Sequence, residues 1–134
     1  MPGCVLRAIG GGFQVERFLE ESSLLPCNVF RKGERKSDNR LWETSGLTVL
    51  VSDSSGDEFA LQIKDAIEFL RANRDELSRL RGFDGLEEMA LDFGVNRNNG
   101  FLQSNFFPAE LIALACDLEM GIELSVYGEE VVIT

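Results

Sequence analysis

Apolar residues recur at every third or fourth position between Asp57 and Arg81. The stripe consists of Phe59, Ile63, Ile67, Leu70, Leu77 and Leu80. This spacing puts the apolar side chains on one face of an α-helix and the charged residues on the other. Ser55 and Glu58 stand in capping-box spacing at its start. The pattern predicts one amphipathic helix over Asp57–Arg81.

Two further segments have helical spacing. Val15, Phe18 and Leu19 predict a short helix from about Gln14 to Ser22. Pro108 occupies a favourable first helical position, and the apolar residues after it predict a third helix that ends at Gly121.

Short apolar or alternating runs predict the strands. They are Cys4–Ile9, Asn28–Arg31, Leu41–Thr44, Leu47–Val51, Leu86–Val95, Phe101–Phe107 and Ile122–Tyr127, with Val131–Ile133 as an edge strand or a tail. A polar turn at residues 96–100 predicts that Phe101–Phe107 folds back as the antiparallel partner of Leu86–Val95.

The predicted order of elements is βαββαββαβ, in a single domain over residues 1–134. Hairpins that alternate with helices favour an α+β fold, a two-layer sandwich of a mixed, mostly antiparallel sheet with three helices on one face. The first six elements fit a ferredoxin-like split βαβ arrangement, so we expect a partly ferredoxin-like sheet.

Charge restricts the partners that the chain can bind. The formal net charge is −10 and the isoelectric point is near 4.4. Phosphate neutralisation dominates nucleic-acid binding, so an acidic chain is a poor binder of DNA or RNA. The charge instead favours a basic protein partner, or it keeps the protein soluble.

Other sequence features bear on location and on metal binding. The chain has no long apolar run and no secretory signal, so we expect a cytoplasmic protein without a membrane segment. Three cysteines without CxxC spacing indicate free thiols, although a Cys4–Cys27 bridge is left open, and zinc is not indicated. Cys116 lies in an apolar helical run, and we expect it to be buried.

Histidine, the commonest general base near neutral pH and a common metal ligand, does not occur in the chain. Scattered carboxylates form no recognisable catalytic pair or calcium loop. We therefore expect no enzymatic activity, no catalytic residues, no metal and no cofactor.

Two groups of residues are candidates for binding. The first would contact a protein partner and comprises Trp42, Glu43, Glu87, Glu88 and Asp92. The second would contact an anion and comprises Arg31, Lys32, Arg35, Lys36 and Arg40. Each group also has a structural interpretation: Trp42 could be a half-buried core anchor, and the basic segment could be a solvated loop. The Gly10–Gly12 turn is a further candidate for contact with an anion.

The order of several short motifs resembles an uncharacterised bacterial family, the domain of unknown function 4279. These motifs are Arg31-Lys32-Gly33-Glu34, Trp42, the Asp57–Arg81 helix, Pro108-Ala109-Glu110-Leu111 and Ile122–Tyr127. The resemblance covers about Phe13 to Tyr127. Ser125 departs from it, because the family has an acidic residue before the closing tyrosine. The resemblance implies a fold and no established activity.

Three hypotheses for function follow. The first is a non-enzymatic cytoplasmic binding domain, of the inhibitor or immunity-protein kind, for a basic protein partner. The second is a small-ligand sensing or regulatory domain that binds an anionic metabolite, and the third is a homodimer in which the open sheet edge pairs with itself.

Overall fold

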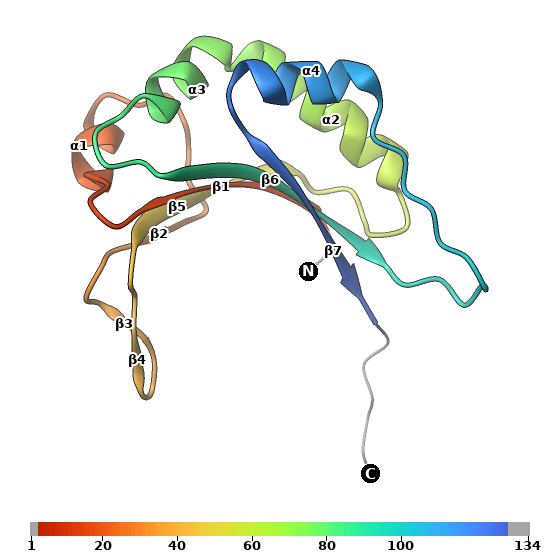
Figure 1. Ribbon diagram of the computed structural model, residues 1–134, viewed down its shortest axis with the longest axis horizontal. Helices are drawn as coiled ribbons and strands as arrows, with labels where there is room; N and C mark the ends of the chain where they lie inside the picture. Colours follow the sequence, from red (N-terminus) through yellow and green to blue (C-terminus); the bar gives the residue numbers. More distant parts are fainter. Residues whose placement is uncertain (1–2, 129–134) are drawn as a thin grey trace.

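The protein is a layer of helices on one face of a twisted sheet (Figure 1). The computed structural model describes residues 3–128. The elements are β1 (Gly3–Gly10), α1 (Val15–Glu20), β2 (Asn28–Phe30), β3 (Arg35–Ser37), β4 (Arg40–Leu41), β5 (Ser45–Ser52), α2 (Phe59–Ala72), α3 (Arg74–Arg81), β6 (Glu88–Asn96), α4 (Ala109–Asp117) and β7 (Gly121–Tyr127). The predicted α+β class, with a mixed and mostly antiparallel sheet, is confirmed.

The five-stranded sheet has the order β2-β5-β1-β6-β7. Its first four strands pair antiparallel, and β7 pairs parallel with β6. β5 lies between β1 and β2, the two strands that α1 connects. In the same way β1 lies between β5 and β6, the two strands that α2 and α3 connect. The sheet thus contains two split βαβ units, which is the predicted ferredoxin-like arrangement. α4 and β7 extend this unit at the β6 side.

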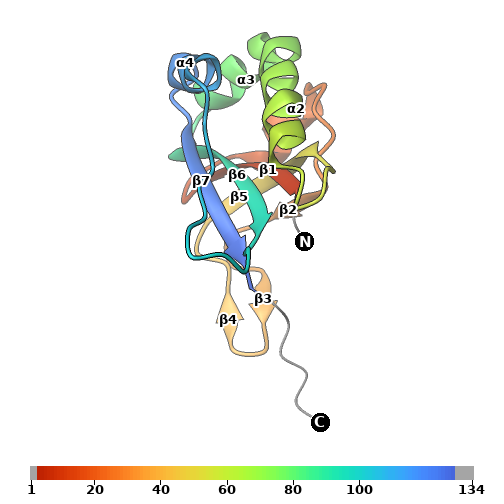
Figure 2. The same ribbon diagram turned by 90° about the vertical axis from the view of Figure 1, so that its right-hand side faces the viewer.

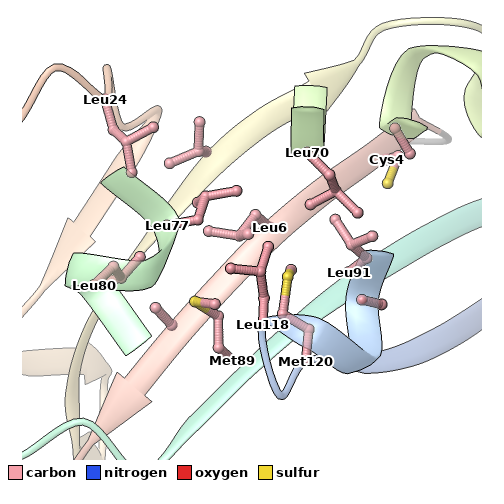
Figure 3. Packing of buried hydrophobic residues seen from close by; sticks show 14 of the residues in the cluster. Cys4, Leu6, Leu24, Leu70, Leu77, Leu80, Met89, Leu91, Leu118 and Met120 are labelled. Atoms are coloured by element: carbon pink, nitrogen blue, oxygen red, sulfur yellow. The ribbon is translucent and has the colours of Figure 1, made fainter. Parts of the chain in front are cut away.

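The core lies between the sheet and the helices. Cys4, Leu6 and Ala8 alternate with less buried residues along β1 and point toward α2 and α3. Leu70, Leu77 and Leu80 of the helical stripe pack onto them, together with Met89 and Leu91 of β6 (Figure 3). Most of the predicted apolar stripe is thus core.

The opposite face of the sheet carries no helix in the described part of the chain (Figure 2). Strand alternation and register place Val5, Arg7 and Ile9 of β1 there, beside Leu50 and Thr48 of β5 and Asp92 and Glu88 of β6. We call this the open face. The β3–β4 hairpin projects from its β2–β5 end (Figure 1).

Two predicted strands are wrong. The predicted strand Leu41–Thr44 is reduced to the two residues of β4, because the chain turns at residues 42–44 toward the start of β5. Phe101–Phe107 is not a strand but an extended loop, in which Phe107 packs against Phe59 and Phe93 at ring-centroid distances of 5.3 and 5.5 Å. The neighbour of β6 is instead β7, because α4 carries the chain back so that the two strands run parallel.

The predicted helix over Asp57–Arg81 is two helices, α2 and α3, so the described residues form four helices rather than three. Asn73 separates them, because its backbone leaves helical geometry at φ −114° and ψ 19°. Its side-chain Nδ2 also donates to the Phe69 carbonyl, four residues earlier. Such local side-chain bonds compete with helix continuation.

Cys116 is exposed on α4 rather than buried, and all three cysteines are free thiols. Val131–Ile133 lies outside the described residues.

Candidate binding cleft on the open face

The hairpin is held at its base by backbone hydrogen bonds. The Gly33 N–H donates to the Trp42 carbonyl at 2.9 Å, and the Trp42 N–H donates to the Glu34 carbonyl at 2.8 Å. Gly33 has a φ of +90°, a left-handed conformation that favours glycine. The Lys32 N–H donates to Ser45 Oγ, which joins the hairpin to the start of β5.

Trp42 stacks on Phe30 and fixes the hairpin against the sheet. The two ring centroids are 4.2 Å apart and the rings are 20° from parallel. Phe30 is buried by this contact and lies opposite Gly46 in the β2–β5 register. Any side chain at position 46 would collide with the Phe30 ring, so the glycine makes room for the stack.

A cleft of about 1060 Å³ lies between the hairpin and the open face. Its apolar wall is formed by Ile9, Phe30, Leu41 and Trp42, and its cationic groups are Arg7, Lys32, Lys36 and Arg40, with Glu43 as the acidic lining residue. Lys36 Nζ also lies 4.8 Å from the centre of the Trp42 ring, within cation–π distance. The cleft therefore combines an apolar wall with several positive charges.

The predicted anion group is only partly assembled in this cleft. Lys32, Lys36 and Arg40 line it and form no ion pair with an acid in residues 3–128. Arg31 instead pairs with Glu16 of α1 and with Glu34, and its bond to Glu16 raises the pKa of its guanidinium above the ordinary value. Arg35 does not line the cleft. Arg31 thus anchors the hairpin, while its neighbours remain available to a ligand.

Arg7 was missed by the sequence reasoning. It projects from the middle of the open face, where Asp92 lies 3.7 Å and Glu123 lies 3.4 Å from its guanidinium. Ser125 Oγ donates to Asp92 at 2.7 Å, so the serine that departs from the family resemblance supports this network. The signal in the sequence was a single charged residue at a polar position of the otherwise apolar β1.

The predicted partner-contact residues fall in four places. Trp42 and Glu43 line the cleft, and Asp92 belongs to the Arg7 network. Glu88 is exposed and pairs in register with Ile9 on the open face. Glu87 accepts a hydrogen bond of 2.6 Å from the Gly11 N–H, so it is engaged within the chain.

The Gly10–Gly12 turn packs tightly against Gly85. A Cβ at Gly10 would lie 1.9 Å from the Gly85 carbonyl oxygen, and Gly85 itself has a φ of +83°. These close backbone contacts account for the glycines, and the Gly11 N–H already binds the Glu87 carboxylate. The turn is thus a packing feature of the β1–α1 and α3–β6 connections.

Within residues 3–128 no cluster of three or more His, Cys, Asp or Glu side chains is arranged to hold a metal ion. Over the same residues, no helix has the length and apolarity needed to cross a bilayer. A scan against protein-family models, a search of curated proteins and a search of solved structures gave no significant match to this chain. The resemblance to the domain of unknown function 4279 therefore stays a prediction.

Proposed function

We propose that this chain is a binding domain without a catalytic role, and that its ligand enters the hairpin cleft through an anionic group. The observation that carries the proposal is the gathering of Lys32, Lys36 and Arg40 in one cleft without acidic partners among residues 3–128. Of the hypotheses from the sequence, this geometry favours the small-ligand sensing or regulatory domain.

Charge distribution supports this choice. Residues 31–43 carry five basic and three acidic side chains, whereas the rest of the chain carries eight basic and twenty acidic ones. Surface cations on so acidic a chain have many carboxylates nearby to pair with, as Arg7, Arg31 and Arg71 do. Lys32, Lys36 and Arg40 of the cleft, in contrast, form no ion pair within residues 3–128. They lie beside an apolar wall, which strengthens their attraction to an anion.

Size and lining indicate the kind of ligand. Pockets for small molecules typically measure roughly 300–1,000 Å³, and they combine apolar walls with a few polar groups. The cleft volume of about 1060 Å³ is at the upper end of that range. Ile9, Leu41 and Trp42 offer contact to an apolar body while the cations bind its charge. An anion with an apolar or aromatic body, such as a nucleotide, fits this lining.

The test is titration calorimetry at low salt with pyrophosphate, citrate and ATP as probes. We expect at least one probe to bind, and the Lys32→Ser/Lys36→Ser variant to bind it on the order of tenfold more weakly, since each lost charge-assisted contact contributes about 1 kcal/mol or more. The matched control Lys64→Ser/Arg97→Ser removes two cations that form no ion pair in the described residues and lie outside the cleft. Equal weakening in both variants, or no binding of any probe, would contradict the proposal.

A basic protein partner, as for an inhibitor or immunity protein, is the second candidate function. The observation that favours it is the acidic half of the open face, where Glu88, Asp92 and Glu123 share one side of the sheet. Such a surface would accelerate association with a basic protein and lose affinity with salt.

Pull-down at low salt and at about 0.5 M salt tests this candidate, because screening removes attraction between exposed charges. The comparison is between Glu88→Lys and Glu20→Lys, two exposed glutamates on the open face and on α1. We expect a basic protein to be retained at low salt by the wild type and by Glu20→Lys, and lost with Glu88→Lys. Equal retention by both variants would exclude the open face as its site.

A further inference from the structure

The outer edge of β7 leaves backbone groups unpaired within residues 3–128. In the described residues β7 pairs only with β6, and the Arg97 N–H donates to the Tyr127 carbonyl at 2.8 Å on that side. Because backbone groups of successive residues point to opposite sides of a strand, the N–H and C=O groups of Ile122, Leu124 and Val126 point away from β6. No hydrogen-bond partner within residues 3–128 meets them there.

Apart from the charge of Glu123, this edge lacks the features that usually protect an edge strand. β7 contains no proline, no lysine and no bulge, and it is seven residues long. The opposite edge, β2, has three residues and follows closely on Pro26. Proteins commonly shorten or charge exposed edges to prevent pairing with another chain. The two edges of this sheet differ in that respect, and β7 is the one open to pairing.

Apolar side chains accompany the free backbone groups. Val126 is 51% exposed and Leu124 is 36% exposed on the helix-bearing face. The loop from β6 to α4 adds Phe101, Leu102 and Phe106, which are 108%, 74% and 79% exposed. The loop begins at the C-terminal end of β7, where the Arg97–Tyr127 bond joins them (Figure 2). Exposed aromatic residues beside an unpaired strand are typical of an interface.

We propose that a second copy of this chain pairs with β7, strand against strand, to form a symmetric dimer with a continuous ten-stranded sheet. Two identical strands that pair across a two-fold axis are antiparallel. Only the register centred on Leu124 pairs all seven residues of both strands. In that register Ile122 faces Val126 of the other copy.

The same register satisfies the unpaired groups. Antiparallel pairs that exchange two hydrogen bonds alternate with pairs that exchange none. Bonded pairs at Leu124–Leu124 and Ile122–Val126 use the outward-pointing residues. Glu123 then lies opposite Ser125 of the second copy. The Glu123 carboxylate, which pairs with Arg7 of its own chain, therefore does not face Glu123 of the second copy. The strand is therefore complementary to itself in hydrogen bonding and apolar contact, and the register places no two like charges directly opposite each other.

Exposed apolar side chains near β7 supply a large share of the area that a stable contact needs. Each copy contributes two highly exposed phenylalanines, and burying four such rings would remove on the order of 600 Å² from water. Leu102, Leu124, Val126 and the paired backbones add to this area, and specific interfaces bury roughly 1,200 Å² or more in total. The antiparallel arrangement places the loop of each copy at the start of the other copy's β7.

Sedimentation velocity or light scattering on the whole chain tests the dimer over a concentration series. The expected mass is twice the chain mass of 14.9 kDa at high concentration. Val126→Lys should shift the chain to monomer. Leu50→Lys is the matched control, because Leu50 is also a strand residue that is 51% exposed, but it lies on β5 in the middle of the sheet. Circular dichroism checks that both variants keep the fold.

Three outcomes would overturn the proposal. A wild-type chain that stays monomeric at all concentrations would show that β7 does not pair with a second copy. A dimer that survives Val126→Lys uses another surface, and a dimer that Leu50→Lys also dissociates forms through the open face. Because each copy has a net charge of −10, salt should strengthen this dimer, whereas it should weaken anion binding in the cleft.

Discussion

Replacement of Gly46 by alanine tests how the hairpin is held on the sheet. A Cβ at this position would lie 2.5 Å from the Ala8 carbonyl oxygen, 2.6 Å from Phe30 Cζ and 2.8 Å from Ile9 Cγ2. The carbonyl belongs to the central strand β1 and cannot move without disturbing the ladder. The Phe30 ring can yield only by leaving its stack with Trp42.

The expected loss follows from these contacts. Overpacking a tight site costs about 1–3 kcal/mol, and a stacked aromatic pair contributes about 0.5–1.5 kcal/mol. The lower chain entropy of the unfolded alanine variant offsets about 0.4–1 kcal/mol of this. We expect Gly46→Ala to lower the free energy of unfolding by about 2 kcal/mol, which corresponds to a fall of about 1 M in the urea midpoint.

Urea titration followed by circular dichroism and by the fluorescence of Trp42, the sole tryptophan, measures both effects. Trp42 emission should shift to the red in native conditions as the stack loosens. Gly121→Ala is the control, because the nearest heavy atom to its new Cβ would be Ala90 Cβ at an ordinary 3.8 Å. A Gly46→Ala midpoint equal to that of the wild type, with unchanged emission, would refute the reasoning.

Three further predictions concern the helical layer and the thiols. The Glu76 carboxylate accepts hydrogen bonds from Arg79 Nε and from the Ser23 N–H. Chiefly the bond from Arg79 lowers the pKa of Glu76 below its ordinary value of 4.5. The stability that the ionised carboxylate contributes is therefore present above pH 4.5 and lost as the pH falls through the lowered pKa. Glu76→Gln should therefore be about 1 kcal/mol less stable than wild type at neutral pH in urea titrations, and a difference that persists undiminished at about pH 3 would contradict this. Gln62 is buried and donates from Nε2 to the Ser55 and Gly94 carbonyls, so Gln62→Glu should cost about 3 kcal/mol or more at pH 7; an unchanged melting temperature would show that these bonds do not matter. Burial raises the pKa of the Cys4 thiol. A thiol reagent should therefore label the exposed Cys27 and Cys116 quickly, and Cys4 only on unfolding. Rapid labelling of all three cysteines in the native protein would contradict the burial of Cys4 in β1.

Much of the fold was predictable because single segments carried strong periodic signals. The stripe from Phe59 to Leu80 and the alternation of β1 depend on local spacing, and the structure buries most of these residues. The order and pairing of the first strands followed from hairpin and crossover rules that leave few topologies open. The split at Asn73 was harder to predict, since a single residue departs from helical dihedrals within an otherwise continuous apolar stripe.

The error at Phe101–Phe107 has a different cause. A run rich in phenylalanine favours a strand by composition, but strand formation needs a neighbour with free hydrogen-bonding groups. β6 is already paired with β1 and β7 on its two sides. Phe107 satisfies its apolar character by packing on Phe59 and Phe93 instead. The spacing of residues along one segment does not show which distant segments compete to pair with β6.

The site was predictable in part for the same reason. The basic segment and Trp42 were found from composition, as the sole concentration of cations and the sole tryptophan. Their assembly with Arg7 and Ile9 in one cleft depends on the β1–β5–β2 pairing, which brings residues about thirty positions apart onto the same face. Glu87 and Asp92 were chosen for their charge alone, and the structure engages both within the chain.

Amide chemical shifts during separate titrations with pyrophosphate, citrate and ATP test the central claim most directly, because they locate the binding of each probe residue by residue. The account predicts saturable shifts at Lys32, Gly33, Lys36 and the Trp42 indole, with neighbouring effects at Arg7, and none along α2, α3 and α4. Saturable shifts centred on the helices, or none anywhere on the chain, would contradict it.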